Sequence, residues 1–219
     1  IKQHVLKNYK ISEDKITLIH RCADIERFSP EAVTQERMIN KIKEYNIAED
    51  KPVLLLPGRV TRWKGQHLLI EALHLMKHKN YYCIIIGDAQ GRQKYLDYLE
   101  KLTVKYKLKN RVGFFGRYSD VPALMMVSNV ILSTAIEPEA FGRISVEGQA
   151  MGKIVVASNI GGSLDTIKDG VTGKLYQYDN PQALADALDW ALSLSDAEKA
   201  AIGKAGIKNV KENFTKEIM

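Results

Sequence analysis

Two acidic residues stand at the ends of a Glu-x7-Glu pattern within residues 137–152, EPEAFGRISVEGQAMG. Glu147 shares a helical spacing with Ile144 and Met151, so its carboxylate is expected on the same inward helix face as two apolar side chains. A carboxylate on such a face is costly unless something bonds to it. A ligand hydroxyl is one candidate partner, and a nearby lysine is the other, since structural ion pairs are common.

Glu139 precedes that helix, and the two acids suit the two ends of one ligand. A helix rises 1.5 Å per residue, so we expect the carboxylates about 10 Å apart. The amides of Phe141, Gly142 and Arg143 would point out of the helix N-terminus, which favours an anion. A nucleotide-sugar has this layout, with hydroxyls at both ends and phosphates between them. The alternative is a solvated loop acid followed by an ion-paired helix acid.

A second charged group follows an apolar run at residues 52–57. Gly58 allows close approach of the backbone, and Arg59 and Lys64 stand in the loop after it. These cations could converge on a diphosphate, Arg59 through its planar fork and Lys64 as a point charge. Two solvated loop cations are the alternative, because exposed charges are the rule. Later in the chain, the Gly161-Gly162 pair permits another close backbone approach.

The two segments together resemble a known family. GRVTRWKGQ (58–66) and EAFGRISVE (139–147) are similar to retaining glycosyltransferases of family 4, which have the two-domain GT-B fold. The resemblance is to the C-terminal, donor-binding domain and covers most of the chain. The sequences of both segments are similar to those of bacterial enzymes of lipopolysaccharide-core assembly, including mannosyltransferases. One departure is Cys22, which stands where the family usually has glycine.

The resemblance implies roles for individual residues. Arg59 and Lys64 would bind the donor phosphates and neutralise the charge that builds on the leaving nucleoside diphosphate. Glu139 would contact hydroxyls of the transferred sugar, and these three are the implied catalytic residues. Glu147 would bond the ribose hydroxyls. The other implied donor-binding residues are Gly58, Arg117, Tyr118, Phe141, Gly142 and Arg143, with Arg117 and Tyr118 near the base.

The implied reaction moves a sugar, with mannose one candidate, from a GDP- or UDP-linked donor to a glycan or lipopolysaccharide-core acceptor. No cofactor and no metal are expected, since the sequence has no Asp-x-Asp motif. The spacing of His74 and His78 can bind zinc, but they fall on the polar side of an amphipathic helix. A non-catalytic nucleotide-binding module and a GT-B-like epimerase are the alternative functions.

Apolar strand-like runs alternate with amphipathic helical segments at βαβ spacing. This predicts an α/β fold with a doubly wound parallel sheet, Rossmann-like, in which ligands bind beyond the carboxyl ends of the strands. We expect residues 1–28 to be the end of an N-terminal domain and a linker, and residues 29–219 to be the nucleotide-sugar-binding domain. The expected strands are 15–20, 52–57, 81–86, 111–115, 130–134, 153–158 and 172–176.

Composition and charge limit the setting. The 219 residues carry a net charge of +6, and no apolar run approaches 18 residues, so no membrane span is expected. Two cysteines suit a reducing compartment, and we expect a cytoplasmic protein, with peripheral association at the inner face of the membrane as an option. The basic residues are not interleaved with aromatics, which argues against a nucleic-acid partner. The start of the sequence resembles a cut into a longer protein, so this chain alone is expected to be inactive.

Overall fold

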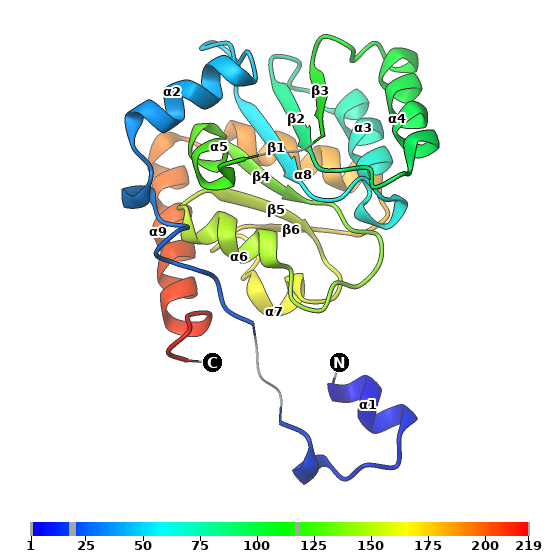
Figure 1. Ribbon diagram of the computed structural model, residues 1–219, viewed down its shortest axis with the longest axis vertical. Coiled ribbons are helices and arrows are strands. Elements are labelled where there is room, and N and C mark those ends of the chain that lie inside the picture. Colours follow the sequence, from blue (N-terminus) through cyan, green and yellow to red (C-terminus); the bar gives the residue numbers. More distant parts are fainter. Residues whose placement is uncertain (1, 18–20, 117–118, 219) are drawn as a thin grey trace.

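A parallel sheet forms the centre of the molecule in the computed structural model, which describes residues 2–17, 21–116 and 119–218 (Figure 1). The strands are β1 (Val53–Pro57), β2 (Tyr82–Ile86), β3 (Val112–Phe115), β4 (Val130–Ser133), β5 (Ile154–Ser158) and β6 (Lys174–Tyr176). The α-helices are α1 (Lys2–Asn8), α2 (Gln35–Glu44), α3 (Gln66–Leu75), α4 (Gln93–Lys105), α5 (Val121–Val127), α6 (Arg143–Ala150), α7 (Ser163–Thr166), α8 (Pro181–Ser193) and α9 (Asp196–Asn213). Short 3-10 turns are η1 (Glu13–Lys15), η2 (Pro30–Ala32) and η3 (Arg62–Lys64).

The strand order is β3-β2-β1-β4-β5-β6, and every neighbouring pair is parallel. The chain runs from β1 outward to β3 and then returns to place β4 on the other side of β1. The order therefore reverses between β1 and β4, which is where ligands bind in open sheets of this kind. The predicted doubly wound α/β fold is confirmed.

Helices cover both faces of the sheet, and each face has its own apolar core (Figure 1). On one face α3 packs against both α8 and α4; on the other α6 packs against α9, and α2 against α5. Leu54 and Leu56 of β1 belong to the first core, while Val53 and Leu55 belong to the second. This two-sided burial explains why β1 is a continuous apolar run rather than an alternating one.

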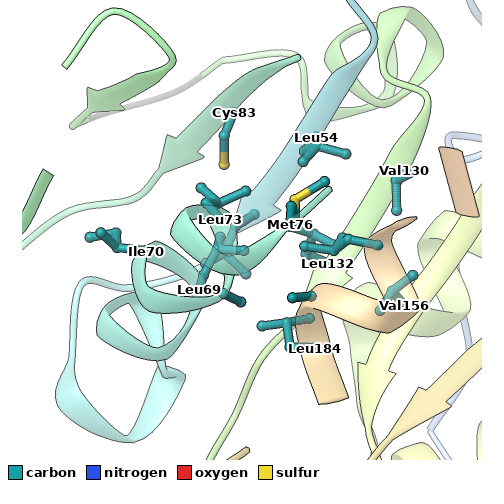
Figure 2. Packing of buried hydrophobic residues seen from close by; sticks show 14 of the residues in the cluster. Leu54, Leu69, Ile70, Leu73, Met76, Cys83, Val130, Leu132, Val156 and Leu184 are labelled. Carbon is teal, nitrogen blue, oxygen red and sulfur yellow. The ribbon is translucent and has the colours of Figure 1, made fainter. Parts of the chain in front are cut away.

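Figure 2 shows the first core, where Leu69 and Leu73 of α3 and Met76, directly after that helix, pack toward the strands. Each of these three side chains is fully buried. They pack in one cluster with Leu54 of β1 and Leu132 of β4, the two strands on either side of the order reversal. Truncating a leucine at such a site costs about 2–5 kcal/mol, so this shared cluster helps to hold β1 beside β4.

The N-terminal segment departs from the expectation of a strand at 15–20. Glu13–Lys15 forms the turn η1, residues 16–17 are irregular, and residues 18–20 lie outside the described part. Alternating hydrophobicity makes a strand only where a neighbouring strand can accept its backbone hydrogen bonds. In Figure 1, α1 and residues 13–17 lie away from the sheet, so residues 13–17 have no such neighbour. Within the described ranges, no helix is long and apolar enough to cross a bilayer.

Candidate functional site

An ion pair joins the loops that follow β1 and β4. Lys64, the last residue of η3, donates from Nζ to Oε1 of Glu139 in the loop before α6. The side chains of the pair are only 16% and 15% exposed. The stem of Lys64 passes over Gly58, where an added Cβ would stand 3.8 Å from Cδ and Cε of the lysine. Three of the predicted site residues therefore meet where the strand order reverses.

Backbone contacts with the end of β4 fix the position of η3. Ile136 donates its N–H to the carbonyl of Trp63 at 2.8 Å, and Thr134 donates its hydroxyl to the carbonyl of Lys64 at 2.8 Å. Gly65 follows with a φ of +71°, and a Cβ there would lie 1.9 Å from the Thr134 carbonyl oxygen. Only glycine permits this approach, so the Lys-Gly sequence places the lysine as well as supplying it.

Trp63 lies beside both cations of this loop. The guanidinium carbon of Arg59 is 5.8 Å from the Trp63 ring centroid, and Nζ of Lys64 is 4.5 Å from it. Both distances fall within the range of cation–π attraction. Gln66 supports the loop by donating from Nε2 to the Arg59 carbonyl at 2.8 Å. The sequence interpretation did not include Trp63, although an aromatic residue between two loop cations was a usable signal.

Glu147 lies on the inward face of α6, as its spacing predicted, and is 8% exposed. Burial raises the pKa of its carboxyl to about 7, while Arg143 and then Arg27 act in the opposite direction. Nε of Arg143 stands 3.4 Å from Oε1 of Glu147, so the ionic partner is an arginine rather than the lysine considered from sequence. Arg27 comes from the segment before η2, and nothing in its sequence context indicated this position.

The start of α6 has the geometry expected of an anion-facing helix end. Gly142 precedes the helix with a φ of +76°, a left-handed conformation that other residues adopt at a cost. The helix then begins at Arg143, with Gly142 as its N-cap. The first N–H groups of a helix have no acceptor within it, so the amides around Gly142 can serve an external acceptor.

Two glycines after β5 hold the loop that carries Glu139. Gly162 donates its N–H to the Glu139 carbonyl at 2.7 Å. An added Cβ would lie 2.5 Å from the Glu139 carbonyl oxygen at Gly161, and 2.4 Å from the Phe141 carbonyl carbon at Gly162. The close backbone approach predicted for this pair is therefore to the Glu139 loop, and β5 contributes to the site through it.

The predicted residues form two neighbouring groups. Gly58, Arg59, Lys64 and Glu139 gather around the ends of β1 and β4, and the chain runs directly from Glu139 into the group on α6. The second group consists of Phe141, Gly142, Arg143 and Glu147. The separation of about 10 Å between the two carboxylates stays a prediction. Arg117 and Tyr118 lie outside the described residues.

His74 lies on α3, but the helix ends at Leu75, so His78 lies beyond it and the two do not share one helix face as expected; each has a partner of another kind. The ring of His74 stacks on Tyr106 with centroids 4.6 Å apart, and Nδ1 of His78 lies 3.0 Å from Oδ1 of Asp189. Among the described residues, no three His, Cys, Asp or Glu side chains gather as metal ligands would. Hollows of about 730 and 690 Å³ lie beside α4 and α9, and neither is lined by Lys64, Glu139 or Glu147. Strand order and charged contacts, rather than concavity, therefore locate the site.

Comparison with known proteins fits this geometry. The family model described as glycosyl transferases group 1 matches residues 38–209, which include both groups of site residues. The chain belongs to this family. This family corresponds to the retaining glycosyltransferases of family 4, which have the GT-B fold. The parallel sheet agrees with that fold.

Individual glycosyltransferases resemble the chain along nearly its whole length. A crystal structure of a glycosyltransferase from Rickettsia africae is 39% identical, with a TM-score of 0.96, over 99% of this chain and 57% of that one. Anabaena Alr3699/HepE, crystallised with UDP and glucose, is 26% identical, with a TM-score of 0.89, over 98% of this chain and 57% of that one. A D-inositol 3-phosphate glycosyltransferase of Xylanimonas cellulosilytica is 27% identical over 97% of this chain. The chain spans about half the length of that relative, 51%.

Proposed function

We propose that this chain is the donor-binding half of a retaining glycosyltransferase and holds a nucleoside-diphosphate sugar at the carboxyl ends of β1 and β4. The observation that carries the proposal is the Lys64–Glu139 ion pair at the reversal of the strand order. A cation for phosphate and an acid for sugar hydroxyls are there within bonding distance of each other. Membership of the glycosyl transferases group 1 family supports the same reaction class.

The cations act on the diphosphate. An ammonium has three N–H donors, so Lys64 can keep one on Glu139 and direct others at phosphate oxygens. Arg59, beside the same Trp63 ring, adds a planar fork that suits two phosphate oxygens. Charge grows on these oxygens as the sugar leaves, so both cations stabilise the transition state more than the bound donor. Glu139, already oriented by Lys64, accepts from hydroxyls of the transferred sugar.

The second group holds the nucleoside. The Glu147 carboxylate accepts from the two ribose hydroxyls, and the amides around Gly142 donate to oxygens of the donor. UDP is the favoured nucleotide because the Anabaena relative was crystallised with UDP and glucose. The acceptor is a glycan or a lipid-linked glycan such as a lipopolysaccharide core, taken at the cytoplasmic face of the membrane. A GT-B-like epimerase would share this donor site, and transfer to an acceptor distinguishes the two.

Thermal unfolding with UDP, GDP and ADP tests the donor site. A ligand that binds only the folded state stabilises it by about 2.7 kcal/mol at one hundred times its Kd, so UDP should raise the Tm most. Lys64→Ala should weaken UDP binding about tenfold or more, since it removes a charge-assisted contact. Lys101→Ala, at an exposed position of α4, is the matched control and should bind UDP as the wild type does. Equal loss in both variants, or no response to any nucleotide, would contradict the proposal.

A further inference from the structure

A positively charged hollow lies away from the proposed donor site, where β5 begins. Lys153 stands directly before Ile154, the first residue of β5, while the glycines of the donor site follow the other end of that strand. The hollow has a volume of about 690 Å³ and lies between α9, the end of α5 and the start of β5. Its lining includes Lys153, Met126, Ile207 and, from α9, Lys204, Lys208 and Lys211.

Lys153 has one acceptor and no carboxylate partner among the described residues. Its Nζ donates to the Met126 carbonyl at 2.6 Å, which leaves two donors of an ammonium unmatched. The acid that lines the hollow, Glu212, is exposed and pairs with Lys208 at 3.7 Å instead. Burial lowers the pKa of the Lys153 amine to about 8, with no charged neighbour contributing to the shift. At pH 7.5 roughly a quarter of these amines are neutral, against about a thousandth of ordinary lysines.

The lysines of α9 make the entrance to the hollow positive. Lys204, Lys208 and Lys211 are four and three residues apart, so they share one face of the helix. A concave surface lined by one sign of charge raises the local concentration of the opposite ion. The hollow thus combines a partly buried amine, which is nucleophilic when neutral, with a rim that attracts small polyanions.

We propose that Lys153 is a site of Nε-acylation by acyl phosphates, which the lysines of α9 draw into the hollow. The lone pair of the neutral amine attacks the acyl carbonyl carbon, and the carbon–oxygen bond to phosphate breaks. Inorganic phosphate leaves with the bonding electron pair, and the nitrogen loses its extra proton to water. The product is an amide whose remaining N–H can still donate to the Met126 carbonyl, so the fold need not open to accommodate it.

Acetyl phosphate applied to the full-length protein tests the site. Peptide mass spectrometry would give the initial rate of acetylation at Lys153, at exposed Lys43 of α2 and at exposed Lys204 on the rim. At pH 7.5 a larger fraction of the Lys153 amine is neutral than for an ordinary lysine, although a less basic amine is also a weaker nucleophile. The two effects together should make Lys153 react about tenfold faster than Lys43. The rate at Lys153 should reach half its maximum near pH 8. A Lys153 rate equal to or below that of Lys43 would overturn the proposal.

A rim variant separates recruitment from burial. In the Lys204→Gln/Lys211→Gln protein, acetyl phosphate should modify Lys153 several-fold more slowly, while the uncharged reagent N-acetoxysuccinimide should modify it at the wild-type rate. Circular dichroism would confirm that the variant keeps its Tm. If Lys204 reacts as fast as Lys153, proximity to the rim alone explains the modification and burial has no part. If both reagents slow equally, the rim does not recruit anions, and that half of the proposal is wrong.

Discussion

Glu147 combines a proposed binding role with an energetic penalty in the folded protein. Its carboxyl is buried, with a pKa raised to about 7 by desolvation, although Arg143 lies 3.4 Å away. The exposed guanidinium does not offset the loss of water around the acid, because exposed ion pairs are weak. Such a residue lowers stability when charged, and binding sites commonly retain residues of this kind.

Replacing Glu147 with glutamine should therefore stabilise the protein at alkaline pH. Between pH 4.5 and 7 the folded state holds this proton more tightly than the unfolded state, so wild-type stability falls as the pH rises through that window. The Glu147→Gln variant lacks this loss and should be more stable by about 1–3 kcal/mol at pH 8, with the difference vanishing near pH 4.5. Urea unfolding at several pH values measures it. The exposed Glu100→Gln control should show no such trend. A Glu147→Gln protein that is less stable than the wild type at pH 8 would show that the charged Glu147 carboxylate does not lower stability.

Donor affinity should depend on the same Glu147 proton, but it should rise with pH where the stability of the protein falls. The charged carboxylate accepts from both ribose hydroxyls, whereas the protonated acid has one acceptor fewer. With a pKa near 7, the charged fraction rises about tenfold from pH 6 to pH 8, and so should the affinity for UDP-glucose. UDP-glucose is preferable to UDP because its diphosphate has no proton to lose in this range. Calorimetry on Glu147→Gln should give weak and nearly pH-independent binding; an unchanged pH dependence there would assign it to another group.

At the scale of elements, the loop before α6 is held from two sides. The end of β4 bonds to η3 through the Trp63 and Lys64 carbonyls, and Glu139 bonds to Gly162 after β5. The loops after β1, β4 and β5 thus form one connected unit, and none of them sets the position of Glu139 alone. Loops built on a rigid sheet in this way keep functional groups within narrow limits.

Gly161→Ala should disturb this unit of loops more than an alanine at another left-handed glycine would. Gly161 and Gly170 both have left-handed φ values, +60° and +72°, so alanine is strained by about 1 kcal/mol at either site. A Cβ at Gly161 would meet the Glu139 backbone at 2.5 Å, whereas at Gly170 nothing lies within 4 Å. UDP-glucose affinity should fall at least about tenfold in Gly161→Ala and stay near wild type in Gly170→Ala. Similar affinities in the two variants would show that the glycine does not position the loop.

The sequence predicted the elements better than the contacts between them. Apolar runs at βαβ spacing identified the six strands of the sheet, and the helical spacing of Glu147 identified its inward face. The Lys64–Glu139 pair was not predicted, because it depends on β1 lying beside β4, which follows only from the strand order. Arg27 was missed for the same reason, since it reaches α6 from far along the chain. Local patterns determine periodicity, whereas pairing across the sheet depends on tertiary packing.

At the scale of the whole molecule, the two ends of the sheet carry different chemistry. The carboxyl ends of β1, β4 and β5 support the cations and acids of the proposed donor site, and Lys153 precedes the opposite end of β5. Acylation at Lys153 should therefore leave nucleotide affinity unchanged. The two proposals are separable, since loss of UDP binding would not alter the reactivity of the Lys153 amine.

Nucleotide binding and sugar transfer should differ in whether they require more than this chain, which a comparison with the full-length protein can show. All the described residues of the proposed donor site lie in the loop after β1, in the loop after β4 or on α6, and the chain spans about half of the Xylanimonas cellulosilytica relative, so an acceptor half is expected in the longer protein. The 219-residue chain should bind UDP but release no sugar from UDP-sugars, because transfer requires the acceptor to be held against the donor. Calorimetry with UDP and chromatography of donor breakdown measure the two steps on both proteins. Comparable turnover by the chain alone would mean that the acceptor half is dispensable, whereas binding without turnover in the full-length protein would favour a nucleotide-binding module.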